Sequence, residues 1–453
     1  MRRIKKVYVA NRGEVAVHII RACRRLGVQT VVGVSEADRY GMAAMIADEA
    51  VVIGAAAPKV SYLDINANIE CALRTGCDAI HPGYGFLAEN ARFAAQCQSS
   101  GLIFIGPDSA SIESLGDKEA ARQLADEAGV PTVPGENGVT DVSVAKEVGR
   151  RIGYPIMIKA AAGGGGRGIR VVRSEEEIAH AFTNAMAEAG AVFGDSRLYI
   201  EKYVQNARHI EVQIAGDESG RTLHFGERDC TSQRRNQKII EESPSPVLDA
   251  QTRQRLCLSA VQLAEHCGYK NLGTVEFIYD VDTNEFYFME MNTRLQVEYP
   301  VTEACTNIDL IELSIRIADG EPIPFNQDDI THTGHAVECR INAEDPKNGF
   351  APSPGAISNW RPTDLPNVKV NSHCYPGLQI TPFYDSLIAK VVAWGETRDQ
   401  AIEDMALALE GLEIEGIRTT KDLCMELVQS ENFRSNSMNT QWVEKYIDNR
   451  KQQ

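Results

Sequence analysis

A predicted β-hairpin at residues 274–298 carries charged side chains in positions where a buried strand is normally apolar. Apolar and polar residues alternate on both sides of a polar turn at residues 282–284, as is typical of two paired strands. Glu276 and Glu290 lie at similar distances from this turn, so their carboxylates can face each other across the pair. Like charges placed opposite each other destabilise a sheet unless something neutralises them. The hairpin therefore predicts a bound cation, with a pair of ordinary surface glutamates as the alternative.

The residues after Glu290 extend the same face of the predicted hairpin. Asn292 and Arg294 follow at a period of two, which places their side chains on the side of Glu290. Two carboxylates and an amide form an oxygen-rich site suited to Mg²⁺, which one or two carboxylates and substrate phosphates commonly hold. The sequence therefore predicts a magnesium site.

Length and composition indicate a multidomain protein of ordinary globular type. The chain has 453 residues, of which 43% are hydrophobic and 24% are charged, enough for two to four domains of about 100–200 residues. No apolar run approaches the roughly 18 residues of a membrane helix, and the basic start lacks the features of a secretory signal, so we expect a cytoplasmic protein. The 11 cysteines contain no Cys-x-x-Cys pair, which argues against disulfides and structural zinc. The net charge of −17 disfavours nucleic acid and anionic membranes as partners.

The first 110 residues predict an open parallel α/β sheet. Short apolar runs alternate with helical patterns, and we expect strands at 7–10, 31–34, 50–53, 79–80 and 102–105. The turn after the first strand is Asn11-Arg-Gly-Glu instead of Gly-x-Gly-x-x-Gly, which disfavours a dinucleotide-dependent dehydrogenase. The segment His81-Pro-Gly-Tyr-Gly-Phe stands where a strand ends, a place where open α/β sheets bind ligands. A tight Pro-Gly turn is the alternative interpretation.

A glycine-rich loop follows a Pro-rich boundary near residue 130. The strand Tyr154–Lys159 ends in a lysine, and glycines at 163–166 and 168 precede a second strand at 169–172. Glycines let backbone N–H groups approach an anion, so the loop is suited to phosphate and to movement as a lid. It differs from a P-loop because the lysine precedes the glycines and a strand follows them. The alternative, a flexible linker, would not lie between two apolar strands.

Together these motifs resemble the ATP-grasp fold and, more closely, the biotin carboxylase family. The similar segments occur in family order over nearly the whole chain. They are Asn11-Arg-Gly-Glu, His81-Pro-Gly-Tyr-Gly-Phe-Leu-Ala-Glu-Asn, Gly163-Gly-Gly-Gly-Arg-Gly, Glu227-Arg-Asp-Cys-Thr-Ser-Gln-Arg-Arg, Glu290-Met-Asn-Thr-Arg-Leu-Gln-Val-Glu, Glu338-Cys-Arg-Ile-Asn-Ala-Glu-Asp and Tyr384-Asp-Ser-Leu-Ile-Ala-Lys.

The resemblance implies a mixed α/β and α+β architecture. An N-terminal open parallel α/β domain would occupy 1–115, and an ATP-grasp domain 116–334, with a small mobile lid at about 131–203. A mixed α+β domain would occupy 335–446, where the apolar spacing of Ala401, Met405, Ala408 and Leu412 itself predicts a helix. The implied activity is ATP-dependent carboxylation of carrier-bound biotin by bicarbonate, through carboxyphosphate, as the first half-reaction of a biotin-dependent carboxylase.

The same resemblance implies which residues bind the nucleotide and its metal. One or two Mg²⁺ or Mn²⁺ ions would be held by Glu276, Glu290 and Asn292. The ATP-binding residues would contact phosphates, adenine and ribose; besides the two metal-binding glutamates they are Lys118, Lys159, Gly163, Gly164, Gly165, Gly166, Glu201, Lys202, Val204, His209, Gln233 and Asn236. For His209, a structural histidine on the strand 210–214 is the alternative.

The resemblance also implies a bicarbonate and biotin site. Bicarbonate would be bound by Lys238, Arg294, Gln296 and the backbone of Val297, with Glu298 as general base. Two adjacent cations would lower the pKa of Glu298 and weaken it as a base, but they also promote loss of the bicarbonate proton.

Two further residues are matched to biotin. Arg340 would stabilise the enolate form of biotin, and Tyr84 would touch its ring. The alternative for Arg340 is a structural salt bridge to Glu338 or Glu344.

Three positions depart from the family pattern. Asn236 and Tyr299 stand where histidine is usual, and Ala162 stands where glycine is common. We expect these changes to tune nucleotide affinity or lid motion without removing activity, because every proposed metal and bicarbonate ligand is present.

The implied partners are a separate biotin carboxyl carrier protein and carboxyltransferase subunits, because the chain has no Met-Lys-Met biotin-attachment motif. The family also implies a homodimer. The final carboxyl acceptor is left open among an acyl-CoA, pyruvate, another 2-oxo acid and a urea-like compound. Two other functions are considered: a different ATP-grasp ligase, disfavoured by the Glu298 and Arg340 motifs, and a non-catalytic nucleotide-binding subunit, disfavoured by the intact metal ligands.

Overall fold

The computed structural model describes residues 3–160, 170–193 and 196–451. The chain forms two compact units. A main unit comprises the described part of Met1–Val130, Arg208–Phe277 and Glu290–Gln453, and a small unit comprises that of Pro131–Ala207 and Ile278–Met289. The predicted phosphate loop at 163–166 and the departure at Ala162 lie outside the described residues.

The predicted N-terminal parallel sheet is confirmed. Its five strands have the order β3-β2-β1-β4-β5 and are all parallel. Their bounds are β1 Lys6–Val9, β2 Gln29–Ser35, β3 Glu49–Gly54, β4 Ala79–His81 and β5 Ile103–Phe104. Because β1 and β2 are buried along nearly their whole length, they show the continuous apolar pattern of a covered parallel sheet.

Helices alternate with these strands and have defined starts. Their bounds are α1 Gly13–Arg25, α2 Met42–Ile46, α3 Ile65–Arg74, α4 Ala91–Ser99, α5 Ser109–Gly116 and α6 Lys118–Glu127. The side chains of Asp64 and Asn90 accept backbone N–H groups at the start of α3 and α4, which satisfies donors that a helix end leaves unpaired. Gly13 has a positive φ of 65° at the point where the chain turns from β1 into α1.

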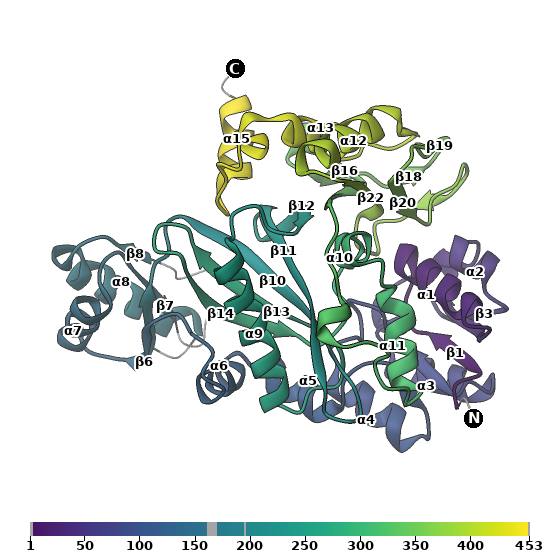
Figure 1. The fold of residues 1–453 in the computed structure, drawn as a ribbon, viewed down its shortest axis with the longest axis horizontal. Helices are drawn as coiled ribbons and strands as arrows, with labels where there is room; N and C mark the ends of the chain where they lie inside the picture. Colours follow the sequence, from purple (N-terminus) through teal and green to yellow (C-terminus); the bar gives the residue numbers. More distant parts are fainter. Residues whose placement is uncertain (1–2, 161–169, 194–195, 452–453) are drawn as a thin grey trace. The chain divides into compact units, whose positions relative to one another are not determined.

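The predicted charged hairpin belongs to an eight-stranded sheet with the order β14-β13-β10-β11-β12-β15-β22-β20. The bounds are β10 Ala207–Gly216, β11 Thr222–Arg234, β12 Gln237–Ser243, β13 Asn271–Asp280, β14 Glu285–Asn292, β15 His335–Asn342, β20 Val368–Ser372 and β22 Leu387–Gly395. Helix α9, Ala250–His266, packs against β11 (Figure 1). The hairpin turns between Asp280 and Glu285, as predicted.

The C-terminal region adds helices to one end of this sheet. Helix α12, Arg398–Gly411, packs on β22 and β15, and the predicted residues Ala401 and Met405 are fully buried there. The other helices of this region are α13 Lys421–Gln429, α14 Glu431–Arg434 and α15 Trp442–Lys451. Between the hairpin and this region, α10 Tyr299–Thr306 packs on β15 and β22, and α11 Leu310–Ala318 packs on α1. Short strands form three two-stranded sheets: β16 Glu344–Asp345 with β17 Ala351–Pro352, β18 Gly355–Ala356 with β21 Gln379–Ile380, and β19 Asn359–Arg361 with β23 Glu413–Glu415.

The small unit is an α+β element with its own core. Its sheet has the order β6-β9-β7-β8 and pairs antiparallel; the bounds are β6 Gly135–Val139, β7 Ile156–Ala160, β8 Arg170–Val172 and β9 Leu198–Lys202. Helices α7, Val142–Ile152, and α8, Glu175–Phe193, pack side by side (Figure 1). Ile158, Phe182 and Ile200 are buried together. This core is separate from those of the main unit.

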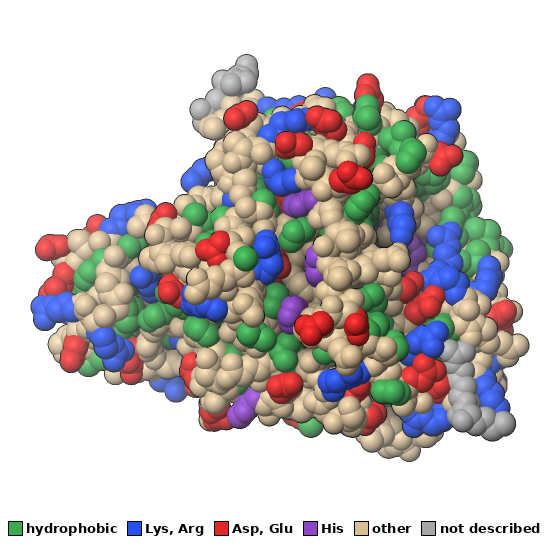
Figure 2. Space-filling view, viewed as in Figure 1, with side chains coloured by type: hydrophobic (Ala, Val, Ile, Leu, Met, Phe, Trp, Pro, Cys, Tyr) green, Lys and Arg blue, Asp and Glu red, His purple; other side chains and the backbone are tan. Residues whose placement is uncertain are grey.

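The surface mixes charges of both signs. Figure 2 shows Lys and Arg interspersed with Asp and Glu over the visible face, without a single extended acidic area. In the described part of the chain, no helix is both long and apolar enough to cross a membrane.

Candidate active site

Lys238 lies at the centre of a buried cluster of carboxylates in the main unit. Its Nζ is 2.5 Å from Glu298 Oε1, 2.6 Å from Glu211 Oε2 and 3.0 Å from Glu276 Oε1. Burial disfavours the charged form of Lys238, but the surrounding negative groups raise its pKa well above the ordinary value. Lys238 is therefore a permanent cation at this position.

Arg340 joins the cluster from strand β15. Its Nη2 donates to Glu298 Oε2 at 2.9 Å, and its Nε donates to Glu241 Oε1 at 2.5 Å. These hydrogen-bonded partners differ from Glu338 and Glu344, the two carboxylates of the alternative interpretation. One guanidinium edge thus connects the predicted general base to a second buried carboxylate.

Glu298 is fully buried between two cations. Burial alone would raise the pKa of its carboxyl, but Lys238 and Arg340 outweigh that effect and hold it well below the ordinary value. Glu298 is consequently ionised at neutral pH, and its role as a general base stays a prediction. Its position at the start of α10 fixes the backbone that carries it.

Two buried partners of this cluster, Glu211 and Arg228, were given no role from the sequence, although Arg228 lies within one of the family motifs. Arg228 Nε donates to Glu211 Oε1 at 2.5 Å, and Arg228 Nη1 donates to Thr302 Oγ1 at 3.0 Å. Burial still raises the pKa of Glu211. The signal was present in β10, where Glu211 stands between Ile210 and Val212, the same pattern of a charge within an apolar strand that drew attention to Glu276.

A chain of hydrogen bonds connects Lys238 to the predicted bicarbonate residues. Gln296 Nε2 donates to Glu276 Oε1 at 3.1 Å, and Arg294 Nη1 donates to Gln296 Oε1 at 2.9 Å. Arg294 Nη2 also donates to Asn292 Oδ1 at 3.0 Å. The structure thus joins Glu276 and Asn292, of the predicted metal residues, to the side chains of the predicted bicarbonate residues Lys238, Arg294 and Gln296.

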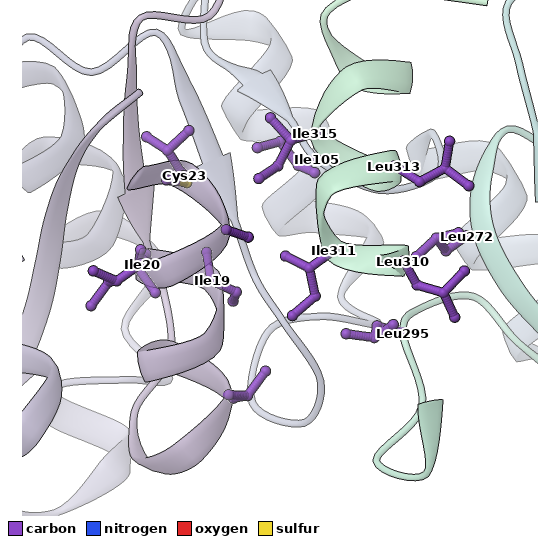
Figure 3. Close-up of a cluster of buried hydrophobic side chains, with 14 of the residues drawn as sticks. Ile19, Ile20, Cys23, Ile105, Leu272, Leu295, Leu310, Ile311, Leu313 and Ile315 are labelled. Carbon is purple, nitrogen blue, oxygen red and sulfur yellow. The ribbon is translucent and has the colours of Figure 1, made fainter. Parts of the chain in front are cut away.

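Leu295, which lies between Arg294 and Gln296 in the sequence, is part of a buried apolar cluster. It packs with Leu310 and Ile311 of α11, as Figure 3 shows. Arg294 forms a further ion pair with Glu89, at 2.8 Å from Nε to Oε2. The segment that carries the polar groups is therefore anchored by the apolar packing of Leu295 and by the ion pair of Arg294. Glu89 was given no role from the sequence.

The side-chain oxygens of Glu276, Glu290 and Asn292 are of the kind that binds a divalent cation. Burial and the charge of Glu276 raise the pKa of Glu290, so a bound cation would favour its ionised form. The amide nitrogen of Asn292 is buried without a hydrogen-bond partner among the described residues. Carboxylate and amide oxygens are the ligands that Mg²⁺ prefers. That the two carboxylates face each other stays a prediction.

The other predicted nucleotide residues of the main unit lie near the same cluster or at a turn. His209 Nε2 is 3.0 Å from Glu276 Oε2, and Lys118 Nζ is 3.9 Å from Glu290 Oε2. Gln233 pairs in register with Lys238 across β11 and β12. Asn236, in the connecting turn, has a φ of 63°, a conformation that asparagine adopts more readily than most residues.

In the small unit, Lys159 at the end of β7 forms an ion pair with Glu201 of β9. Val204 follows Lys202 just after that strand and is buried. The predicted adenine hinge is thus a short segment that follows β9, an interior strand of this sheet, next to a lysine on the neighbouring strand β7.

Tyr84 and Val297 share one buried cation, Lys390. Tyr84 donates from its hydroxyl to Glu14, whose carboxylate Oε1 lies 3.1 Å from Lys390 Nζ. Lys390 also donates to the carbonyl oxygen of Val297 at 2.7 Å. Lys390 ends the family motif that begins at Tyr384, but no role was predicted for it from the sequence.

Comparison with family models covers most of the chain. Residues 3–112 match the N-terminal domain of biotin carboxylase, and residues 338–445 match its C-terminal domain. Residues 117–326 match the ATP-binding domain of the carbamoyl-phosphate synthase L chain.

Curated relatives match over nearly their full length. The chain is 50% identical over 444 residues to biotin carboxylase 1 of Bacillus subtilis, covering 98% of this chain and 99% of the relative. It is 47% identical over 442 residues to a pyruvate carboxylase subunit from Methanothermobacter thermautotrophicus, covering 97% of this chain and 90% of the relative.

Solved structures agree with this result. The biotin carboxylase domain of a thermophilic 2-oxoglutarate carboxylase bound to bicarbonate is 44% identical, with a TM-score of 0.94 and 98% of each chain covered. The corresponding domain dimer of Hydrogenobacter thermophilus, in complex with MgADP, ADP and bicarbonate, is 45% identical, with a TM-score of 0.88 and the same coverage. The chain therefore belongs to the biotin carboxylase family, with that family's ATP- and bicarbonate-dependent activity in the first half-reaction of biotin-dependent carboxylases.

Proposed function

We propose that this chain carboxylates biotin on a separate carrier protein, through carboxyphosphate formed from ATP and bicarbonate. The observation that carries the proposal is the placement of Glu298 between Lys238 and Arg340, with both cations within 3.0 Å of its carboxylate oxygens. Such an arrangement binds an anion, holds a base beside it and keeps a cation ready for a second developing negative charge.

Bicarbonate binding is assigned to Lys238, Arg294, Gln296 and the backbone of Val297. Cations beside a bound bicarbonate lower its pKa together with that of Glu298, so the proton moves between two acids of lowered pKa. Glu298 takes the proton while Lys238 neutralises the charge on the bicarbonate oxygens. What decides whether Glu298 can accept the proton is thus the difference between its pKa and the pKa of bound bicarbonate.

The nucleotide and its metal are assigned to the residues that the family resemblance implies. In the main unit Glu276, Glu290 and Asn292 would hold Mg²⁺ or Mn²⁺, as one ion or two, with Lys118 and His209 beside them. When bound, the metal neutralises phosphate oxygens during phosphoryl transfer. The remaining ATP contacts are assigned to Gln233, Asn236, Lys159, Glu201, Lys202, Val204 and Gly163, Gly164, Gly165 and Gly166.

Biotin activation is assigned to Arg340, with Tyr84 against the ring. The guanidinium is fixed by two carboxylates, so its position does not depend on the substrate. A planar, permanently charged group suits the oxyanion of an enolised ureido carbonyl. Carboxyphosphate breaks its carbon–oxygen bond to give carbon dioxide and phosphate. The phosphate takes the proton of the ureido nitrogen, and that nitrogen forms its new bond to carbon dioxide.

The partners follow from the family and from relatives with similar sequences. We propose a separate biotin carboxyl carrier protein, carboxyltransferase subunits and a homodimer of this chain; a biotin carboxylase dimer is the form described for the Hydrogenobacter structure. A pyruvate carboxylase subunit and a 2-oxoglutarate carboxylase subunit have similar sequence identity to this chain, so the final carboxyl acceptor stays open. A cytoplasmic location stays a prediction.

The test is ADP release from MgATP with bicarbonate, biotin or both. We expect release that requires both substrates and falls by roughly 10²–10⁴-fold in Glu298→Gln. Glu303→Gln is the matched control on α10, because burial raises the pKa of Glu303 to about 8 and the amide resembles its neutral form.

Two results would contradict the proposal. A different ATP-grasp ligase would release ADP with another acceptor and ignore biotin. A non-catalytic nucleotide-binding subunit would bind MgATP and release no ADP, even with a biotinylated carrier protein.

A further inference from the structure

Lys390 is a buried lysine on β22 with two partners in the main unit. Its side chain is fully buried, and its Nζ donates to the carbonyl oxygen of Val297 at 2.7 Å. The same Nζ lies 3.1 Å from Glu14 Oε1. A buried ammonium is costly unless it is paired and hydrogen-bonded, and here both conditions are met.

Two aromatic rings complete the surroundings of this ammonium. Nζ lies 4.4 Å from the centroid of the Tyr299 ring and 5.5 Å from that of Tyr84. Ring faces attract a desolvated cation. Tyr299 is itself held by its hydroxyl, which is 2.5 Å from His18 Nδ1.

The carbonyl that Lys390 contacts belongs to an irregular segment. Residues 293–298 lie between the end of β14 at Asn292 and the start of α10 at Tyr299. Without a regular backbone ladder, such a segment depends on individual anchors for its conformation. Leu295 provides an apolar anchor within this segment (Figure 3). Lys390 provides a polar anchor through the carbonyl of Val297, two residues after Leu295.

We propose that Lys390 is a positioning residue: by holding the Val297 carbonyl, it fixes the backbone that presents Gln296, Val297 and Glu298 to bicarbonate. Glu14 extends the same anchor to Tyr84, whose hydroxyl donates to the carboxylate that pairs with Lys390. One buried ammonium therefore connects the backbone of the bicarbonate site with the residue assigned to the biotin ring. This inference rests on the proposed function for the assignment of bicarbonate to the Val297 backbone.

The decisive variant is Lys390→Met, which keeps an unbranched side chain one atom shorter and removes the donor. We expect the KM for bicarbonate to rise about tenfold or more, because a hydrogen bond from a charged donor is lost. The KM for ATP should change less than twofold. A general loss of structure would instead alter both constants or lower the amount of active enzyme.

The matched control is Lys6→Met. Lys6 Nζ likewise donates to a backbone carbonyl, that of Thr75 at 2.7 Å, and lies 3.2 Å from the carboxylate of Glu49. Since Lys6 is on β1, in the N-terminal sheet, we expect no change in either KM. Lys390→Arg, which keeps the charge and donors, should recover part of the bicarbonate affinity.

A measurement without catalysis separates this inference from the proposed function. Amide hydrogen exchange of residues 293–298 should be faster in Lys390→Met than in the wild-type chain, and unchanged in Lys6→Met. If the single variant fails to fold, Lys390→Met with Glu14→Gln removes the donor and both buried charges together and should show the same faster exchange.

The outcomes distinguish the two ideas. An unchanged exchange rate, or an active variant with an unchanged KM for bicarbonate, would overturn the role of Lys390. A wild-type chain that fails to carboxylate biotin while Lys390→Met still exchanges faster would overturn the proposed function and leave the backbone anchor standing.

Discussion

Two adjacent glutamates on β12, Glu241 and Glu242, are both buried and both paired with arginine, yet their pKa values move in opposite directions. Glu242 accepts Arg398 Nε at 2.6 Å, and its Oε2 lies 2.8 Å from His335 Nε2. Burial would raise its pKa, but these partners lower it to about 2. Burial raises the pKa of Glu241 to about 7, although Arg340 opposes this shift.

The difference lies in how many carboxylates share one cation. Arg340 contacts Glu241 and Glu298 together, whereas Arg398 forms its ion pair with Glu242, which also has His335. Successive residues of a strand point to opposite faces, so one strand carries a balanced ion pair on one face and a carboxylate-rich cluster on the other. The balanced face supports the fold, and the unbalanced face is where charged substrates are proposed to bind.

The largest expected effect comes from breaking the balanced face. Glu242→Gln should lower the free energy of unfolding by about 3–5 kcal/mol, because it leaves Arg398, which is largely shielded from solvent, without its counter-charge. Chemical denaturation measures this change. Glu413→Gln, which removes an exposed partner of Arg361, is the control and should cost about 1 kcal/mol or less. A Glu242→Gln protein as stable as the control would contradict the structural role.

Breaking the unbalanced face should affect catalysis first. Arg340→Leu removes the cation proposed to stabilise enolised biotin, and we expect biotin-dependent turnover to fall roughly 10²–10³-fold. Steady-state ADP release with and without biotin measures it. Arg398→Leu serves as the comparison on the other face and should reduce stability while the turnover of the folded enzyme stays within a few-fold. Equal turnover losses in both variants would remove the distinction between the faces.

The two glutamates should also give opposite pH dependences of stability. Glu242 has a folded pKa of about 2, below its ordinary unfolded value, so its contribution is present above about pH 4.5 and is lost as pH falls toward 2. Glu241 has a folded pKa of about 7, above its ordinary value, so its ionisation destabilises the fold increasingly from about pH 4.5 to 7.

Glu241→Gln should therefore be the more stable protein above pH 7, by about 1–3 kcal/mol. The difference from the wild-type chain should disappear below about pH 4.5. Denaturation at pH 4, 6 and 8 tests this expectation. A Glu241→Gln variant less stable than the wild-type chain at pH 8 would show that ionised Glu241 stabilises the fold, which is the opposite of the prediction.

The smallest expected effect concerns Tyr299, the family departure beside Glu298. Tyr299→Phe removes the hydroxyl that meets His18 and should cost about 0.5–1.5 kcal/mol of stability, with turnover within a few-fold of wild type. We expect the same small kinetic effect for Tyr299→His and for Asn236→His. A wild-type chain that is inactive and is rescued by either histidine would refute the expectation that these departures only tune the enzyme.

The sequence predicted the fold well where periodicity was strong. The parallel N-terminal strands and the buried face of α12 follow from apolar spacing alone, because burial of both faces or of one helix stripe leaves a clear pattern. The hairpin turn between β13 and β14 was equally clear. The strand order of the eight-stranded sheet was not, since β12 pairs with β15 almost a hundred residues later and no local pattern encodes such a partner.

The candidate site was predicted through residue motifs and not through its electrostatics. The side chains of Glu276 and Glu298 both contact Lys238, and the roles that the motifs imply for them stay predictions. Glu211 and Arg228 were missed because their roles arise only when separate strands bring them together. The opposite behaviour of Glu241 and Glu242 could not be read from the sequence at all, since the two are identical neighbours whose partners lie far along the chain.

The most direct test of the central claim is transfer of label from bicarbonate to biotin. Purified chain, MgATP and ¹⁴C-bicarbonate should produce carboxybiotin, on free biotin or on a biotinylated carrier protein, and Arg340→Leu should greatly reduce it. Hydrolysis of ATP by the wild-type chain with no label on either form of biotin would contradict the account.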